Sequence, residues 1–167
     1  MHHFLLIMYI LLNYIFSNQF DTSLGKCSII INNKNKSDLL SYQKLIQSES
    51  LKLISEYGLI DKKPFQIIIP KTKQEFFKIA KTAPEWGIAI AKSSENKIII
   101  QPASIANISK NRFNEIIIHE LNHLYMYRLI DSSFIPSWFL EGMAMKFSNE
   151  FSYTDKIEIS KALWKQQ

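Results

Sequence analysis

Two histidines and a glutamate stand close together in the second half of this 167-residue chain, in the order His119, Glu120 and His123. In a helix, residues four apart lie one turn above each other, so His119 and His123 would aim their rings at one point. Two imidazoles that converge in this way suit a zinc ion. Glu120 would project about 100° round the helix from His119, beside the metal, where it can take a proton from a zinc-bound water. The alternative interpretation is a pair of hydrogen-bonded core histidines.

A third candidate ligand follows in a second apolar segment. The segment around the histidines is apolar nearly all round, which predicts a buried helix from about residue 111 to 130. A second helix is expected to begin with Ser137 as its N-cap, and Glu141 falls one turn inside it. A helix that packs back on the first would present Glu141 to the same metal. We therefore expect one zinc ion per chain, held by His119, His123 and Glu141, with a fourth position open for water.

These residues also form a recognisable pattern. The signature His-Glu-x-x-His at residues 119–123 is typical of zinc peptidases, and Pro-x-Trp-Phe-x-Glu-Gly-x-Ala follows at 136–144. Together they resemble the peptidase MA-like family of gluzincins, with a match that covers roughly residues 65–148. The resemblance implies a zincin-like fold and hydrolysis of peptide bonds. It carries over the three zinc ligands named above, with Glu120 as the catalytic base that activates the zinc-bound water.

The resemblance also implies where a substrate would lie. Enzymes of this family place an extended peptide along an edge strand of the sheet beside the metal. The corresponding segment, and hence the expected substrate-binding residues, consists of Trp86, Gly87, Ile88 and Ala89.

The chain departs from the family pattern in two places. Met145 occupies the position where thermolysin-like members have an aspartate that orients the first histidine, so that partner must come from elsewhere. The tyrosine or histidine that stabilises the transition state is also not evident. Tyr153 is the nearest candidate for this donor, with Tyr125 and Tyr127 as alternatives.

Two alternatives to this interpretation stay open. The main one is a catalytically degenerate, zinc-stabilised module that binds a peptide or another partner along the edge strand. The other gives Glu115, one turn before His119, a place in the site. For Glu115, an ion pair with Arg112 or exposure to solvent is the favoured interpretation.

The remaining segments predict an α+β domain. Their periodicity and turn signals indicate a helix, a strand, a capped second helix and a β-hairpin, over residues 38–57, 65–69, from 72 onward and over 86–101. We expect a small sheet, of one strand plus the hairpin, packed on the active-site helix and the following glutamate-bearing helix. This minimal zincin-like peptidase domain would span residues 38–167.

The N-terminal segment is expected to be a targeting signal or a membrane anchor. Residues 4–16 are apolar except for Asn13, and this run is shorter than the roughly 20 residues that span a bilayer. We interpret residues 1–20 as a signal peptide cleaved near Ser17 or as an uncleaved membrane anchor, with a hydrophobic helix packed on the domain as a third interpretation. Residues 21–37 predict a linker. We therefore expect an extracytoplasmic protein, secreted or attached to the membrane through this segment.

Composition excludes some partners. The net charge is +5, but Arg112 and Arg128 are the only arginines and the lysines are scattered, so no nucleic-acid partner is expected. A peptide or protein substrate is the expected partner. Cys27 is the only cysteine, which excludes an intramolecular disulfide. We expect it to be an unpaired thiol near a flexible N-terminus rather than a lipid attachment site.

Overall fold

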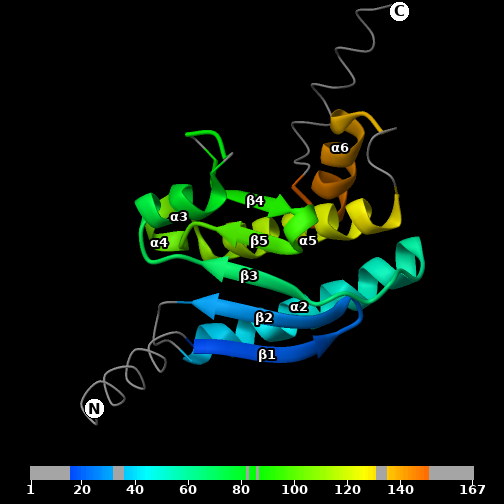
Figure 1. The fold of residues 1–167 in the computed structure, drawn as a ribbon, viewed down its shortest axis with the longest axis horizontal. Helices are drawn as coiled ribbons and strands as arrows, with labels where there is room; N and C mark the ends of the chain where they lie inside the picture. The colour runs from blue at the N-terminus through cyan, green and yellow to red at the C-terminus, as the bar shows by residue number, and fades with distance from the viewer. Residues whose placement is uncertain (1–15, 32–35, 82, 86, 131–134, 151–167) are drawn as a thin grey trace, which may run out of the picture.

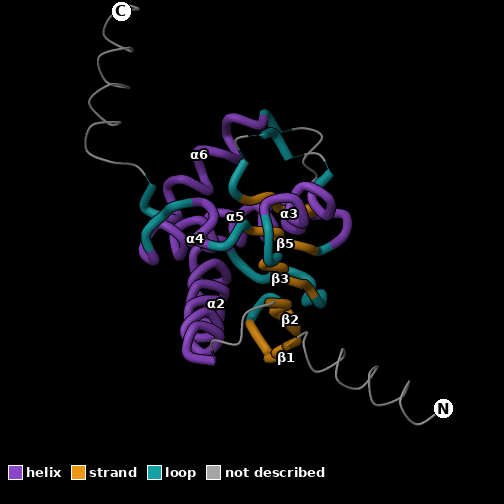
Figure 2. The backbone as a smooth tube through the Cα atoms, turned by 90° about the vertical axis from the view of Figure 1, so that its left-hand side faces the viewer, coloured by secondary structure: helices purple, strands orange, loops and turns teal. Residues whose placement is uncertain are grey.

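The computed structural model describes residues 16–31, 36–81, 83–85, 87–130 and 135–150. In these segments the strands form one mixed sheet, with helices against both of its faces (Figures 1 and 2). The elements, in chain order, are β1 (Phe16–Thr22), β2 (Gly25–Ile31), α2 (Lys36–Tyr57), β3 (Phe65–Ile69), α3 (Lys73–Ala80), β4 (Ala89–Lys92), the 3-10 helix η1 (Ser93–Glu95), β5 (Lys97–Ile100), α4 (Ala103–Ala106), α5 (Lys110–Leu129) and α6 (Ser137–Ser148).

The sheet has five strands in the order β1-β2-β3-β5-β4. The three inner strands, β2, β3 and β5, run parallel, whereas β1 and β4 pair with their neighbours in the antiparallel sense. The parallel step from β3 to β5 passes through α3. β4 is therefore the outer strand at one side of the sheet, and α5 contacts both β4 and β5.

The core lies mainly between the sheet and the helices α2 and α5. Alternate residues of β2 and β3 point into it, among them Ile29 and Ile67, as the two-residue period of a strand requires. β5 is buried on both faces. Ile98 and Ile100 join the main core, while Ile99 packs on the other face against Phe76 and Ala80 of α3. The continuous isoleucine run of β5 follows from this double burial.

The predicted α+β class is confirmed, but the sheet is larger than the expected strand plus hairpin. β1 and β2 lie where residues 1–20 and 21–37 were predicted to be a leader or anchor and a linker. The linker prediction is wrong for residues 21–31, because this segment pairs with β3 in the sheet and has its alternate side chains buried. The described domain therefore begins by Phe16 rather than at residue 38.

The prediction that Cys27 is an unpaired thiol is confirmed, but its expected place near a flexible terminus is wrong. Its side chain is fully buried in β2, and burial raises the pKa of the thiol to about 12. The rest of the N-terminal prediction falls on residues 1–15, which lie outside the described residues. No helix within the described ranges is long and apolar enough to cross a bilayer.

The cap predicted for α3 is confirmed, whereas the cap predicted for α6 is wrong. Thr72 caps α3, since its hydroxyl accepts a hydrogen bond from the Glu75 N–H at 3.1 Å, and the Glu75 carboxylate accepts one from the Lys71 N–H at 2.8 Å. In α6, however, the N-cap is Pro136, and Ser137 is the first helical residue. Ser137 therefore does not act as the cap that the sequence predicted.

Arg128, near the end of α5, forms hydrogen bonds with residues of three loops. Its guanidinium donates hydrogen bonds to the Leu24 carbonyl at 3.0 Å, the Lys63 carbonyl at 3.2 Å and the Asn96 side-chain oxygen at 2.7 Å. The guanidinium also lies over the Phe65 ring, 5.6 Å from its centroid. These contacts fix the C-terminal end of α5 to the β1–β2 turn and to the loops before β3 and β5.

Candidate metal centre

The helices α5 and α6 position the three predicted ligands. Ser109 caps α5, its hydroxyl accepting a hydrogen bond from the Arg112 N–H at 3.1 Å. α6 packs on α5 through Leu140, Ala144 and Phe147, all of which are buried. This leaves the neighbouring Glu141 on the edge of the contact.

The small residues of α6 contribute unequally to this contact. Ala144 is fully buried, as expected for a residue that allows close approach of two helices. Gly142 faces open space, because a Cβ atom added there would meet nothing within 4 Å. Of these two small residues, only Ala144 therefore lies in the contact between α5 and α6.

The three candidate ligands converge. The Nε2 atoms of His119 and His123 lie 3.0 Å apart, and each lies 3.4 Å from a different carboxylate oxygen of Glu141. Tetrahedral zinc with bonds of 2.0–2.1 Å would separate its ligand atoms by about 3.3 Å, so the observed spacing fits such an ion. The chemistry of the donors, two imidazoles and one carboxylate, fits zinc as well. The His–His distance is also compatible with a hydrogen bond between the rings, the alternative that the sequence left open.

Charges around the two rings act on them differently. Burial lowers the pKa of His123, and the nearby His119 lowers it further. For His119, burial also acts to lower the pKa, but the carboxylates of Glu150, Glu120 and Glu141 together outweigh it and the pKa is raised. His123 therefore favours the neutral form that a metal ligand requires.

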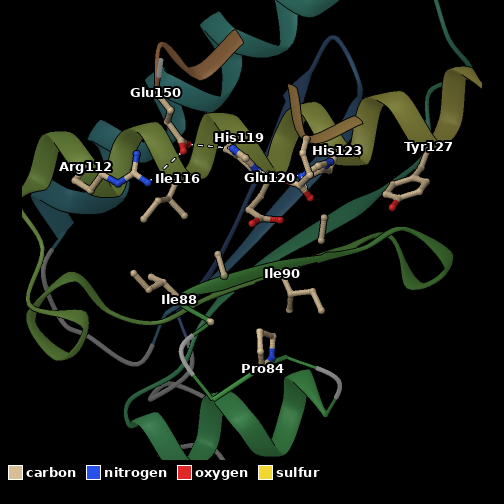
Figure 3. Close-up of a pocket in the computed structure, with 14 residues that line it drawn as sticks. Pro84, Ile88, Ile90, Arg112, Ile116, His119, Glu120, His123, Tyr127 and Glu150 are labelled. Atoms are coloured by element: carbon tan, nitrogen blue, oxygen red, sulfur yellow. Dashed lines mark hydrogen bonds and ion pairs between the residues drawn. The ribbon is translucent and has the colours of Figure 1, made fainter. Parts of the chain in front are cut away.

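Glu120 lies beside this cluster. Glu120 is 8% exposed, and its side chain points from α5 toward β4 (Figure 3). Burial raises the pKa of Glu120 to about 7, an effect that His119 partly offsets. A carboxyl group with a pKa near neutrality can both accept and return a proton at physiological pH.

A pocket of about 550 Å³ opens over these residues, between α5 and the outer strand β4 (Figure 3). Its lining residues are Pro84, Gly87, Ile88, Ala89, Ile90, Ala91, Arg112, Ile116, His119, Glu120, His123, Tyr127, Glu141 and Glu150. Three of the predicted substrate-binding residues, Gly87, Ile88 and Ala89, are among them. The fourth, Trp86, lies outside the described residues.

The segment before β4 is held in place by Gln101. The side-chain amide of Gln101 donates to the Gly87 carbonyl at 2.7 Å, and its backbone N–H donates to the Ile88 carbonyl at 2.8 Å. Gln101 is itself buried. These two hydrogen bonds therefore fix the position of the pocket wall formed by Gly87 and Ile88.

The three tyrosines proposed to stabilise the transition state have different outcomes. Tyr153 lies outside the described residues. Tyr125 is fully buried and donates to the Gly58 carbonyl at 2.7 Å, so this alternative is wrong and the residue is structural. Tyr127 lines the pocket, with its ring centroid 6.4 Å from that of His123.

The sequence did not predict that Glu150 reaches the site. Its Oε1 atom lies 3.0 Å from the His119 Nδ1 atom, and its Oε2 atom lies 3.2 Å from an Arg112 guanidinium nitrogen. Glu150 follows the end of α6, after Asn149 has turned the chain with a positive φ of 60°. Helical spacing ceases to apply there, so no periodicity could have indicated this residue. Arg112 also pairs with Glu115 at 3.1 Å, which confirms the favoured interpretation of Glu115.

The described residues thus bring three candidate metal ligands and a buried carboxylate to one pocket. No protein-family model matches this sequence, and neither does any curated protein. The chemistry of the pocket therefore has to follow from its own residues. They could hold a divalent metal ion and move a proton beside it.

Proposed function

We propose that this chain is a zinc-dependent peptidase with a zincin-like fold, in which His119, His123 and Glu141 hold one zinc ion. The observation that carries the proposal is the convergence of these side chains from α5 and α6, with ligand atoms within 4.8 Å of one another. Two histidines and one carboxylate are the donor set of many catalytic zinc sites, which keep a coordination position open. The resemblance of residues 65–148 to the gluzincins supports the same class.

The reaction we propose is hydrolysis of a peptide bond. A zinc ion bound here would supply Lewis acidity and lower the pKa of a coordinated water to about 7. Glu120 is the group placed to accept the proton of that water and to deliver it to the leaving amine. Its pKa of about 7, raised by burial, suits both steps.

The substrate we propose is a peptide or protein in extended form. β4 is an outer strand, so the backbone edge that faces away from β5 can pair with an added strand. Ile88, Ile90 and Ile116 contribute apolar walls to the pocket beside the candidate ligands. An apolar substrate side chain would therefore be favoured next to the cleaved bond.

Zinc content and cleavage, measured on the full-length chain, test the proposal. One zinc per chain is expected for the wild type and for the control Glu95→Gln, whose carboxylate pairs with Lys92 and Lys97 away from the pocket. Much less zinc is expected for Glu141→Ala and His123→Ala. Cleavage of an unstructured protein should stop on chelation and return when zinc is added back.

The other results would point elsewhere. Zinc without cleavage would favour the alternative, a zinc-stabilised module that binds a peptide along β4. If the wild type retains no zinc, the histidines are a hydrogen-bonded pair in the domain and the peptidase proposal is wrong.

We also propose that the chain is extracytoplasmic, secreted or attached to a membrane by the apolar segment that precedes β1. The support is the composition of residues 4–15. Fractionation of cells that express the full chain would test this, and recovery in the cytosol with the segment intact would contradict it.

A further inference from the structure

Glu150 is held from three directions next to the candidate metal centre. One of its oxygens, Oε1, lies 3.0 Å from His119 Nδ1 and accepts a hydrogen bond from the Ser148 hydroxyl at 3.0 Å. The other, Oε2, lies 3.2 Å from Arg112. The side chain is 10% exposed, and Figure 3 shows it reaching from above α5 to the back of the His119 ring.

The two ring nitrogens of His119 have different surroundings. Nε2 faces His123 and Glu141, where a metal would bind, whereas Nδ1 faces Glu150. Nδ1 is buried, and the Glu150 carboxylate is the group that lies within ion-pair distance of it among the described residues. A carboxylate at this position keeps the ring proton on Nδ1 and leaves the lone pair on Nε2 for a metal ion.

Glu150 also connects the two helices that carry the ligands. Its backbone N–H donates to the Met145 carbonyl at 3.0 Å, which closes the end of α6. Its side chain contacts Arg112 in the first turn of α5 and His119 in the middle of α5. The position of α6, and with it that of Glu141, is therefore tied to α5 at the same residue that meets His119.

We propose that Glu150 is a positioning residue of this metal centre, which sets the tautomer and orientation of His119 and docks the end of α6 on α5. The inference rests on the proposed function. In this proposal Glu150, nine positions after Glu141, orients the first histidine, a role for which the Met145 side chain has no suitable group. Arg112 and Ser148 act through Glu150 by holding its two oxygens in place.

Zinc affinity and the His119 tautomer test this proposal on the full-length chain. Glu150→Gln and Glu150→Ala are expected to weaken zinc binding by about 10–100-fold, measured by competition with a chelating dye. Glu115→Gln is the matched control, because Glu115 also pairs with Arg112, whereas the carboxylates paired with His119 among the described residues are those of Glu141 and Glu150. Its zinc affinity should stay within about twofold of wild type, because Glu115 is not the partner that orients a ligand.

The second readout uses no metal. In long-range proton–nitrogen NMR spectra of the zinc-depleted protein, His119 should be protonated at Nδ1 in the wild type and in Glu115→Gln. It should become a mixture of tautomers in Glu150→Ala. Arg112→Gln, which leaves the Glu150 carboxylate in place without its guanidinium partner, is expected to weaken zinc binding by a smaller factor than Glu150→Ala. This variant keeps the test usable if Glu150→Ala does not fold.

The failures of the two proposals are distinguishable. If the wild type binds no zinc, both the proposed function and the role of Glu150 are wrong. If the wild type binds zinc and the folded Glu150 variants bind it equally well with an unchanged His119 tautomer, only the role of Glu150 is overturned.

Discussion

The Nε2 atoms of His119 and His123 approach to 3.0 Å, one helical turn apart on α5. Two protonated rings would repel each other at this distance, and burial already lowers the pKa of His123. The pair is therefore arranged to share a proton or a metal ion. A bound metal ion, unlike a shared proton, would make the stability of the chain depend on the zinc concentration.

Zinc is expected to stabilise the folded chain, because the ion would bind the converged ligands and not the unfolded state. At free zinc one hundred times the Kd, linkage gives about 2.7 kcal/mol. For a chain of this size that corresponds to a rise in Tm of about 5–10 °C, measurable by calorimetry. The double variant His119→Gln, His123→Gln should show no such rise. An equal rise in that variant would place the zinc elsewhere.

Replacing Glu120 should separate metal binding from turnover. Glu120→Gln keeps the size of the side chain but removes the base, and loss of a general base costs about 10²–10⁴-fold in kcat. Zinc content should remain one per chain, since the ligands are untouched. Steady-state cleavage and metal analysis of the same preparation check both parts. Full activity in Glu120→Gln would remove this residue from the mechanism.

The pH dependence of the stability of the zinc-depleted protein should also reveal the raised pKa of Glu120. Its folded pKa of about 7 lies above the ordinary value of 4.5, so the folded chain keeps a proton that the unfolded chain has lost. This contribution to the free energy of unfolding is fully present below pH 4.5 and is lost as the pH rises through about 7. Between these two pH values, the contribution of Glu120 to the free energy of unfolding falls by up to about 1.4 kcal/mol per pH unit.

Urea unfolding at several pH values provides the comparison. Glu120→Gln cannot ionise at this position, so the zinc-depleted variant should be more stable than the zinc-depleted wild type at pH 8 and comparable to it at pH 4. Parallel pH profiles for the two proteins would contradict the buried state of Glu120.

Arg128 is expected to be a stability determinant without a role in metal binding. Arg128→Met would remove the charged donor to the Leu24 and Lys63 carbonyls, although the Leu24 carbonyl would keep its hydrogen bond from the Lys63 N–H at 3.2 Å. Hydrogen bonds to a charged donor contribute about 1.5–3 kcal/mol each. We expect a loss of about 2–4 kcal/mol in the free energy of unfolding, with unchanged zinc stoichiometry. Lys110→Gln is the control, because Lys110 is exposed and its pairing with Asp38 is long, at 4.0 Å. That change should cost less than about 0.5 kcal/mol.

Cys27 reports whether β1 and β2 belong to the folded domain. The thiol is buried and burial raises its pKa to about 12, so it should not react with iodoacetamide in the native protein at pH 8. It should react fully in urea, with a midpoint that follows the loss of circular dichroism. Rapid alkylation of the native chain would mean that residues 21–37 are the linker that the sequence predicted.

Sequence alone was informative wherever the chemistry is local. The spacing of His119 and His123 within one apolar helix predicted their convergence, because helical geometry follows from backbone hydrogen bonds within the segment. Thr72 and Glu75 predicted the start of α3 for the same reason. Glu115 was correctly interpreted as a partner of Arg112, one turn away.

Tertiary structure decided what depends on residues distant in sequence. The Asn-, Ser- and Lys-containing segment before α2 became strands because Ile29 and Ile31 could be buried beside β3, a pairing that composition does not encode. Glu150 came to His119 because a left-handed turn at Asn149 directs the chain back toward α5. Periodicity describes one element at a time, whereas burial and ion pairing depend on which elements come to lie together.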